Sequence, residues 1–226
     1  MPSLLRRSLA EAVGTFSFVF IGAGVVVMRA APGAGYGLLG IAWAHAIALA
    51  VAITCTMAIS GGHINPAVSI GLLVGRRISA ATAGAYIVAQ LVGAVIAALF
   101  LKWLLPAAGV RNTLLGTPTL GSNVQLGQAI GIEAVLTFFL VSAVYGTCVN
   151  AEAPKVGGFA VGLVLLFDIL VGGTLTGAAM NPARAFGPAF VAGEWVAHIV
   201  WWAGPILGGI VAGLLWEYAI LPPRER

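Results

Sequence analysis

One tripeptide occurs twice in this chain, and its residue types suit the binding of a small polar molecule. The copies are Asn65-Pro66-Ala67 and Asn181-Pro182-Ala183. Asn is a favoured helix N-cap, and Pro is favoured at the first helical position, where an N–H is not needed. Each copy therefore predicts the start of a helix. If the Asn oxygen caps its own helix, its NH2 group is free to donate hydrogen bonds outward.

The apolar residues after each copy predict helices that cross only half of a membrane. These helices cover residues 66–75 and 182–191, and ten residues span about 15 Å of a hydrocarbon layer about 30 Å thick. Two such helices meeting tip to tip would place both N-termini at the bilayer centre, each with roughly half a positive charge. Such a site would bind a neutral dipole and oppose cations.

The composition predicts an all-α integral membrane protein. Of the 226 residues, 60% are hydrophobic and only 8% are charged, whereas soluble domains carry about 25% charged residues. The apolar runs are continuous, which argues against the alternating pattern of a β-barrel. The net charge of +4 does not indicate nucleic-acid binding, because the basic residues lie at the ends of apolar runs. Cys55 and Cys148 lie inside such runs and are expected to be small core residues, with no disulfide and no metal site.

Six longer apolar runs predict six transmembrane helices, at residues 8–28, 38–59, 79–105, 126–149, 156–175 and 194–221. A polar, turn-rich stretch at residues 106–125 is expected to be a loop that divides the chain into halves. One half-helix follows the second span and the other follows the fifth. We therefore expect residues 1–226 to form a single transmembrane domain with two repeats, at about 8–105 and 126–221.

The two halves also resemble each other in sequence, since residues 10–16 (AEAVGTF) match residues 132–138 (IEAVLTF). Three full spans is an odd number, so the second repeat must be inverted relative to the first. Inverted repeats with broken helices at the midplane are a transport architecture. Seven Lys and Arg residues fall on one side and three on the other. This bias predicts cytoplasmic termini. We also expect the protein to lie in the plasma (inner) membrane.

These features together resemble the aquaporins of the major intrinsic protein family. The resemblance rests on both Asn-Pro-Ala boxes, the repeated Glu-Ala-x-x-Thr-Phe, and the stretches at residues 60–65 (SGGHIN) and 181–188 (NPARAFGP). It implies six spans with two re-entrant half-helices, a pore in each subunit and a homotetramer. It also implies a channel for water and small neutral solutes that excludes protons and ions, with no enzymatic activity and no cofactor.

The resemblance places the selectivity arginine of the family at Arg184, and ungapped spacing places three further filter positions at His45, Ile169 and Ala178. Typical water-selective members carry Phe where this chain has His45, and His where it has Ile169. The quartet is similar to that of plant vacuolar-type and some archaeal aquaporins. Water is therefore the expected substrate, and ammonia, hydrogen peroxide and small polyols are alternatives.

Two other functions stay open. A glycerol facilitator usually carries Asp after the selectivity arginine, where this chain has Ala185, and it lacks an aromatic pair such as Trp201-Trp202. An ion-coupled secondary transporter also uses inverted repeats, but it would need ion ligands or titratable groups at the midplane. The candidates for these groups are Glu11, Glu133 and Asp168.

Glu11 and Glu133 are acids at matched places in the two repeats. We expect each carboxylate to accept N–H bonds from the non-helical backbone that leads into a half-helix; the alternative is a proton relay. The carbonyl groups freed in those segments would then line the pore. They belong to Gly61, Gly62, His63, Ile64, Gly177, Ala178 and Ala179. The His63 side chain is also expected near pore water, and Asp168 is expected to be a structural hydrogen-bond partner.

Overall fold

The computed structural model describes residues 2–31 and 33–223, and within these ranges it contains helices and turns but no β-strand. The prediction of an all-α membrane protein is confirmed. The helices are α1 (Leu4–Met28), α2 (Gly37–Ser60), α3 (Pro66–Val74), α4 (Ala80–Leu104), α5 (Ala107–Asn112), α6 (Leu126–Val144), α7 (Phe159–Gly172), α8 (Pro182–Ala192) and α9 (Val200–Leu215). A 3-10 turn at Leu114–Gly116 follows α5, and single π-helical turns extend α6 to Val149 and α9 to Ile220.

In the part of the chain that the structure describes, five helices are long and apolar enough to cross a membrane. They are Leu4–Met28, Gly37–Ser60, Ala80–Leu104, Leu126–Val149 and Val200–Ile220. The predicted span at residues 156–175 is shorter, because α7 has 14 residues and is about 21 Å long. Hydrogen-bonded turns continue this span, with the Gly177 N–H donating to the Gly173 carbonyl at 3.2 Å. The chain is thus an integral multi-pass membrane protein.

The stretch expected to be a loop at residues 106–125 contains α5 and the 3-10 turn. It folds back because Gly109 packs against the end of α1, where an added Cβ would lie 3.0 Å from the Val27 carbonyl oxygen. The last span begins at Val200 rather than at residue 194. The intervening residues form turns, in which Ala197 takes a left-handed φ of 52° and Glu194 accepts a bond from the Val196 N–H.

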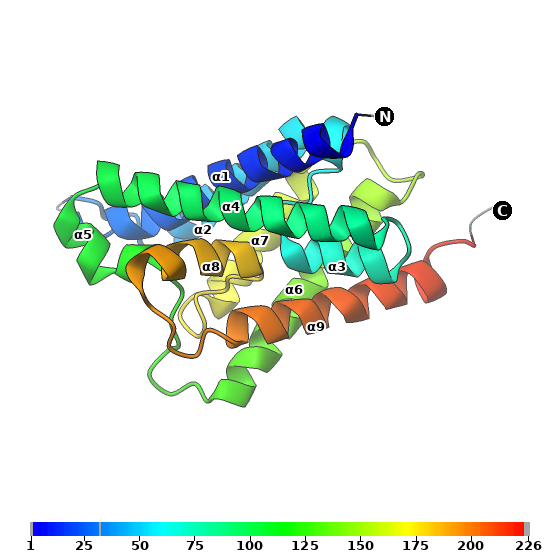
Figure 1. The fold of residues 1–226 in the computed structure, drawn as a ribbon. Helices are drawn as coiled ribbons and strands as arrows, with labels where there is room; N and C mark the ends of the chain where they lie inside the picture. The colour runs from blue at the N-terminus through cyan, green and yellow to red at the C-terminus, as the bar shows by residue number, and fades with distance from the viewer. Residues whose placement is uncertain (1, 32, 224–226) are drawn as a thin grey trace.

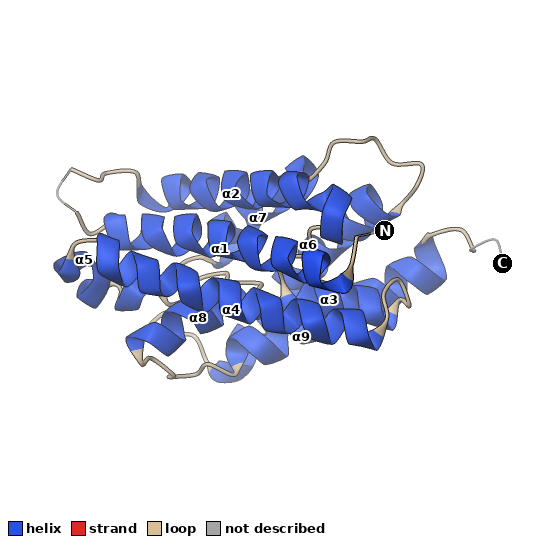
Figure 2. Cartoon of the chain, turned by 45° about the horizontal axis from the view of Figure 1, so that its top comes forward, coloured by secondary structure: helices blue, strands red, loops and turns tan. Residues whose placement is uncertain are grey.

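Figure 1 shows the long helices running side by side, with both ends of the chain at one end of the molecule and α5 at the opposite end. Figure 2 shows the two short helices along the same direction, with α3 nearer the termini and α8 nearer α5. Helix α1 packs against α4, and α6 packs against α9. Contacts of α2 with α7, of α4 with α8 and of α3 with α9 join the two halves.

Glycine permits the close packing of both long helix pairs. A Cβ on Gly93 would lie 2.2 Å from the Ala12 carbonyl oxygen, and one on Gly208 would lie 2.1 Å from the Ala134 carbonyl oxygen. Small residues at helix interfaces let membrane helices approach closely. The Glu-Ala motif of each half therefore packs against a glycine of that half.

We expect Gly208→Ala to destabilise the protein, because the new methyl group would meet backbone atoms of α6 that cannot move alone. Overpacking of this kind typically costs about 1–3 kcal/mol. The matched control is Gly131→Ala in α6, where an added Cβ meets nothing within 4 Å. That change should be neutral or stabilising, since Gly in a helix costs about 1 kcal/mol relative to Ala. Melting temperatures in detergent would distinguish the two variants, and equal values would contradict the packing account.

The structure corrects the expectation for the cysteines. Cys55 is exposed on α2 and is therefore not a core residue, whereas Cys148 is half-buried and packs against the core. A helix face that contacts lipid is as apolar as a helix face in the core. An apolar neighbourhood in the sequence therefore does not predict burial in a membrane protein.

Candidate functional site

Each Asn-Pro-Ala copy begins a short helix. Asn65 has extended backbone (φ −151°), and its Oδ1 accepts a hydrogen bond from the Ala67 N–H at 2.8 Å. Asn181 has the same conformation (φ −148°), and its Oδ1 accepts from the N–H groups of Ala183 at 3.0 Å and Arg184 at 3.2 Å. Each proline occupies the first turn, so the side-chain oxygen of each Asn is fixed as a helix cap.

The two Asn amides also join the repeats. Asn65 Nδ2 donates to the Met180 carbonyl oxygen at 2.8 Å, and Asn181 Nδ2 donates to the Ile64 carbonyl oxygen at 3.0 Å. One N–H of each amide therefore holds the opposite segment. An amide nitrogen carries two N–H groups, so one donor of each Asn is left for a solute.

The segments before the two helices share a backbone conformation that frees carbonyl groups. Left-handed φ values occur at Gly61 (97°) and Ile64 (56°), and again at Gly177 (79°) and Met180 (50°). Within the described residues, no protein group donates a hydrogen bond to the carbonyl oxygens of Gly61, Gly62, His63, Gly177, Ala178 or Ala179. The Ile64 carbonyl differs from this prediction, since it accepts from Asn181 and from Thr15 Oγ1 at 3.4 Å.

Glu11 is fully buried beneath the first of these segments. Its Oε1 accepts from Ser60 Oγ at 2.6 Å and from the His63 N–H at 2.9 Å. Its Oε2 accepts from the Ile64 N–H at 2.6 Å and from Gln90 Nε2 at 2.8 Å. This carboxylate therefore satisfies two backbone N–H groups that no helix or strand could satisfy.

Glu133 is the counterpart of Glu11 in the second half, and it is also fully buried. It accepts from Thr176 Oγ1 at 2.7 Å, from the Ala179 N–H at 3.0 Å and from the Met180 N–H at 2.7 Å. The described residues provide no equivalent of Gln90 on this side. In both halves the acid is a brace for the backbone that leads into the short helix.

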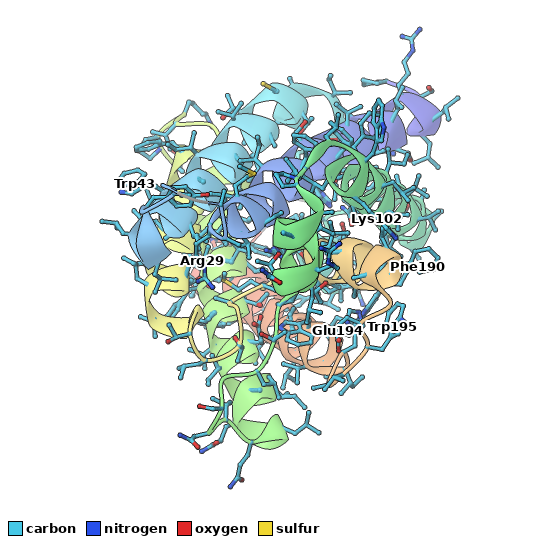
Figure 3. All side chains as sticks on the ribbon, turned by 90° about the vertical axis from the view of Figure 1, so that its left-hand side faces the viewer. Arg29, Trp43, Lys102, Phe190, Glu194 and Trp195 are labelled. Carbon is cyan, nitrogen blue, oxygen red and sulfur yellow. The ribbon has the colours of Figure 1, made fainter. Side chains whose placement is uncertain are left out.

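A cavity of about 190 Å³ opens at the end of the molecule opposite the termini, which is the end that faces the viewer in Figure 3. Its lining includes His45, Ile169, Gly177 and Arg184. These residues come from α2, α7, the segment before α8, and α8 itself. The structure thus brings together three of the four positions that the sequence predicts for a filter.

Arg184 is buried, with only 4% of its surface exposed, and contacts to two residues hold its guanidinium. Its Nη1 donates to the Gly116 carbonyl oxygen at 2.7 Å, and its Nη2 lies 3.3 Å from His45 Nε2. His45 Nδ1 lies 2.9 Å from the Ile41 carbonyl oxygen, which can only accept. Nδ1 must therefore carry the proton, and in the neutral ring Nε2 is then the acceptor for Arg184. The remaining N–H groups of Arg184 are free for the cavity.

The side chain of Ala178 does not face the cavity. It is buried and does not line the cavity, whereas its neighbour Gly177 does. The Ala178 methyl group lies 3.2 Å from where a Cβ on Gly172 would be, so it faces α7. The left-handed backbone of Ala178 (φ 45°) accounts for this direction. The fourth wall of the cavity is backbone of residue 177 rather than the side chain of residue 178.

Three positions of the site were missed or misjudged from the sequence. Gly116 supplies the carbonyl that holds Arg184, but its stretch has only the signals of a loop. Gln90 supports Glu11, yet it reads as one polar residue in an apolar helix. Asp168 was expected to be a hydrogen-bond partner. Its carboxylate is buried, but no described group bonds to its Oδ2, so that expectation is wrong.

Comparison with known proteins agrees with these features over nearly the whole chain. The family model described as major intrinsic protein matches residues 1–216. The chain is 46% identical over 231 residues to a probable aquaporin TIP3-2 of Oryza sativa subsp. japonica, covering 100% of this chain and 85% of the relative. It is 42% identical over 233 residues to a probable aquaporin TIP-type alpha of Phaseolus vulgaris, covering 98% and 88%.

A solved structure shares the fold. The X-ray structure of the aquaglyceroporin from Plasmodium falciparum superposes with a TM-score of 0.86, and the match covers 96% of this chain and 97% of that chain. The two sequences are 24% identical. At this identity the likeness extends to the arrangement of helices only.

Proposed function

This chain belongs to the major intrinsic protein family, and we propose that it is a passive water channel. The observation that carries the proposal is the pair of opposed Asn amides, each fixed as a helix cap and each left with one N–H donor. A water molecule between them would accept a hydrogen bond from each side. The relatives named aquaporin, at more than 40% identity over nearly the full chain, support the same function.

The path that we propose runs from the cavity at Arg184 to the two Asn residues and on past His63. Along this path, water would meet the free N–H groups of Arg184, then the free carbonyl oxygens of residues 177–179, then the Asn amides, and then the carbonyl oxygens of residues 61–63. Selectivity in such pores comes from diameter, lining hydrogen bonds and electrostatic barriers. Donors and acceptors alternate in blocks, so water must reorient at the centre.

Exclusion of cations follows from the charges on this path. The N-termini of α3 and α8 each carry roughly half a positive charge, and Arg184 adds a full charge at the narrow end. A cation that enters from either side therefore loses its hydration shell and meets a positive potential. No chemical step and no energy source is involved, so flux follows the gradient of the solute itself.

The solutes besides water depend on one apolar wall. Ile169 lines the cavity opposite polar groups, and it can neither donate nor accept a hydrogen bond. A filter with polar groups on every side would demand more hydrogen bonds, or hydrogen bonds in other places, than ammonia, hydrogen peroxide and small polyols make. We propose water as the main substrate and these neutral solutes as secondary substrates.

A homotetramer, cytoplasmic termini and a location in the plasma membrane also belong to the proposal. The exposed side chains of α1, α2, α6 and α7 are largely apolar. One apolar groove lies between α1 and α2, and another lies beside α6 and the end of α7. These faces fit contact with lipid or with neighbouring copies. The excess of Lys and Arg at the end with both termini supports the orientation.

A coupled transporter is the rival function. Glu11 and Glu133 already accept hydrogen bonds from protein groups. Of the three candidate acids, only Asp168 makes no hydrogen bond among the described residues. Transport by such a protein would require a proton or sodium gradient, whereas the proposed channel requires none. The gradient requirement separates the two functions.

The direct test is stopped-flow light scattering of proteoliposomes that contain the purified protein, with no ion gradient. We expect osmotic shrinkage well above that of empty liposomes, with a flux that is linear in the osmotic gradient. Glycerol, ammonia and hydrogen peroxide measured in the same vesicles would rank the secondary substrates. Shrinkage equal to that of empty liposomes, from protein that is correctly assembled, would contradict the proposal.

Ile169→His is expected to raise the ratio of water to ammonia permeability. The imidazole would replace the apolar wall by a group that binds water, and it would narrow the cavity beside His45. Ile169→Val is the matched control, because it changes volume without adding polarity. The ratio would be measured from osmotic shrinkage and from alkalinisation of a trapped pH dye. An unaltered ratio in Ile169→His would remove residue 169 from the filter.

A further inference from the structure

We propose that the cavity at Arg184 is also a binding site for a small inorganic oxyanion, and that Arg29 is the residue that makes it one. Occupancy of this site would block the water path at its mouth. The inference rests on the proposed function, because it assigns a ligand to the entrance of the same pore.

The first observation is the charge of the lining. Arg29 and Arg184 both line the cavity, and none of its described lining residues is Asp or Glu. A cleft lined by one sign of charge concentrates counter-ions. Two guanidinium groups with no carboxylate between them therefore make the mouth attractive to anions.

The second observation is that no group among the described residues pairs with Arg29. Its side chain is exposed at the end of α1, and within the described residues it makes neither a hydrogen bond nor an ion pair. Glu194, the acid at this end, lies at the side of α8 with Trp195 and Phe190, away from Arg29 (Figure 3).

The third observation is the set of donors around the two charges. A guanidinium has five N–H groups, and Arg184 uses two of them on Gly116 and His45. Thr119 and Thr174 also line the cavity, and both are exposed at its rim. Arginine forks and hydroxyl groups are the typical partners of planar and tetrahedral oxyanions. A sulfate-like ion fits this chemistry, and the buried filter below would stop it from passing.

Sulfate is the probe for this site. Water permeability of wild-type proteoliposomes would be measured with increasing sodium sulfate on both sides, against sodium chloride at matched ionic strength. We expect a saturable fall of at least twofold in the wild type. In Arg29→Gln the concentration for half-inhibition should rise at least tenfold, each variant being referred to its own permeability in chloride.

Lys102→Gln is the matched control, since Lys102 is a cation at the same end that does not line the cavity. It should keep the sulfate sensitivity of the wild type. The proposal is overturned if sulfate leaves the wild type unaffected, or if Arg29→Gln is inhibited like the wild type. Permeability of the wild type in chloride tests the channel function separately, so failure of the anion site would leave that function standing.

Discussion

Replacing Arg184 with valine should let larger and charged solutes through the channel. The side chain is almost fully buried and bridges Gly116 and His45 across the cavity. Valine would remove a full positive charge and much of the volume at the narrow end. An interaction between charges about 4 Å apart is worth about 4 kcal/mol at the effective dielectric of a partly buried site. Since 1.4 kcal/mol is about tenfold, we expect cation permeability to rise by at least tenfold. Urea is neutral, so its permeability should rise because valine leaves a wider opening.

This prediction is measured as the ratio of urea or cation flux to water flux in proteoliposomes. Arg184→Lys keeps the charge but loses the fork that reaches Gly116 and His45 together. It should therefore exclude cations while admitting more urea than the wild type. Arg111→Val removes an arginine at the same end that does not line the cavity. Unchanged ratios in Arg184→Val would show that this arginine is not part of the selectivity filter.

Replacing Glu133 with glutamine should destabilise the fold, although the two side chains have nearly the same shape. The carboxylate accepts from one hydroxyl and two backbone N–H groups. Glutamine offers only one oxygen to these three donors, and its NH2 group would face donors that have no other acceptor. Hydrogen bonds to charged groups contribute about 1.5–3 kcal/mol each. We therefore expect a loss of several kcal/mol, seen as a low yield of monodisperse protein and a lower melting temperature.

The control for the brace is Glu152→Gln, because Glu152 is an exposed acid in the turn after α6. It should melt like the wild type. Glu11→Gln should resemble Glu133→Gln, since Glu11 satisfies the matching backbone groups of the first half. If Glu133→Gln were as stable as Glu152→Gln, the carboxylate would not be holding the segment that leads into α8, and a role in proton transfer would regain support.

Much of the fold could be predicted because the sequence signals are local and repeated. Asn65 and Asn181 each combine an N-cap with a following proline, and the structure starts α3 and α8 directly after them. The long helices follow continuous apolar runs, so their existence was predictable, and only their first and last residues differ from the prediction. Glu11 and Glu133 were placed beside the non-helical segments because an acid inside an apolar helix needs donors that no neighbouring turn can provide.

The remaining features depend on directions and contacts that spacing does not encode. The side chain of Ala178 faces α7 because its backbone is left-handed, and residue types alone did not indicate this conformation. The Asn amides donate across the junction because the two tips approach within hydrogen-bond distance, which only the packed halves determine. Arg184 reaches Gly116, 68 residues away, through a fold-back of the stretch between the halves.

An experimental structure at a resolution that shows ordered water is the most direct test of the proposed water path. We expect a single file of water from the cavity beside Arg184 to His63. One molecule of that file should lie within hydrogen-bond distance of Nδ2 of both Asn65 and Asn181. Side chains that close the space between these two amides, with water excluded from it, would contradict the proposed path.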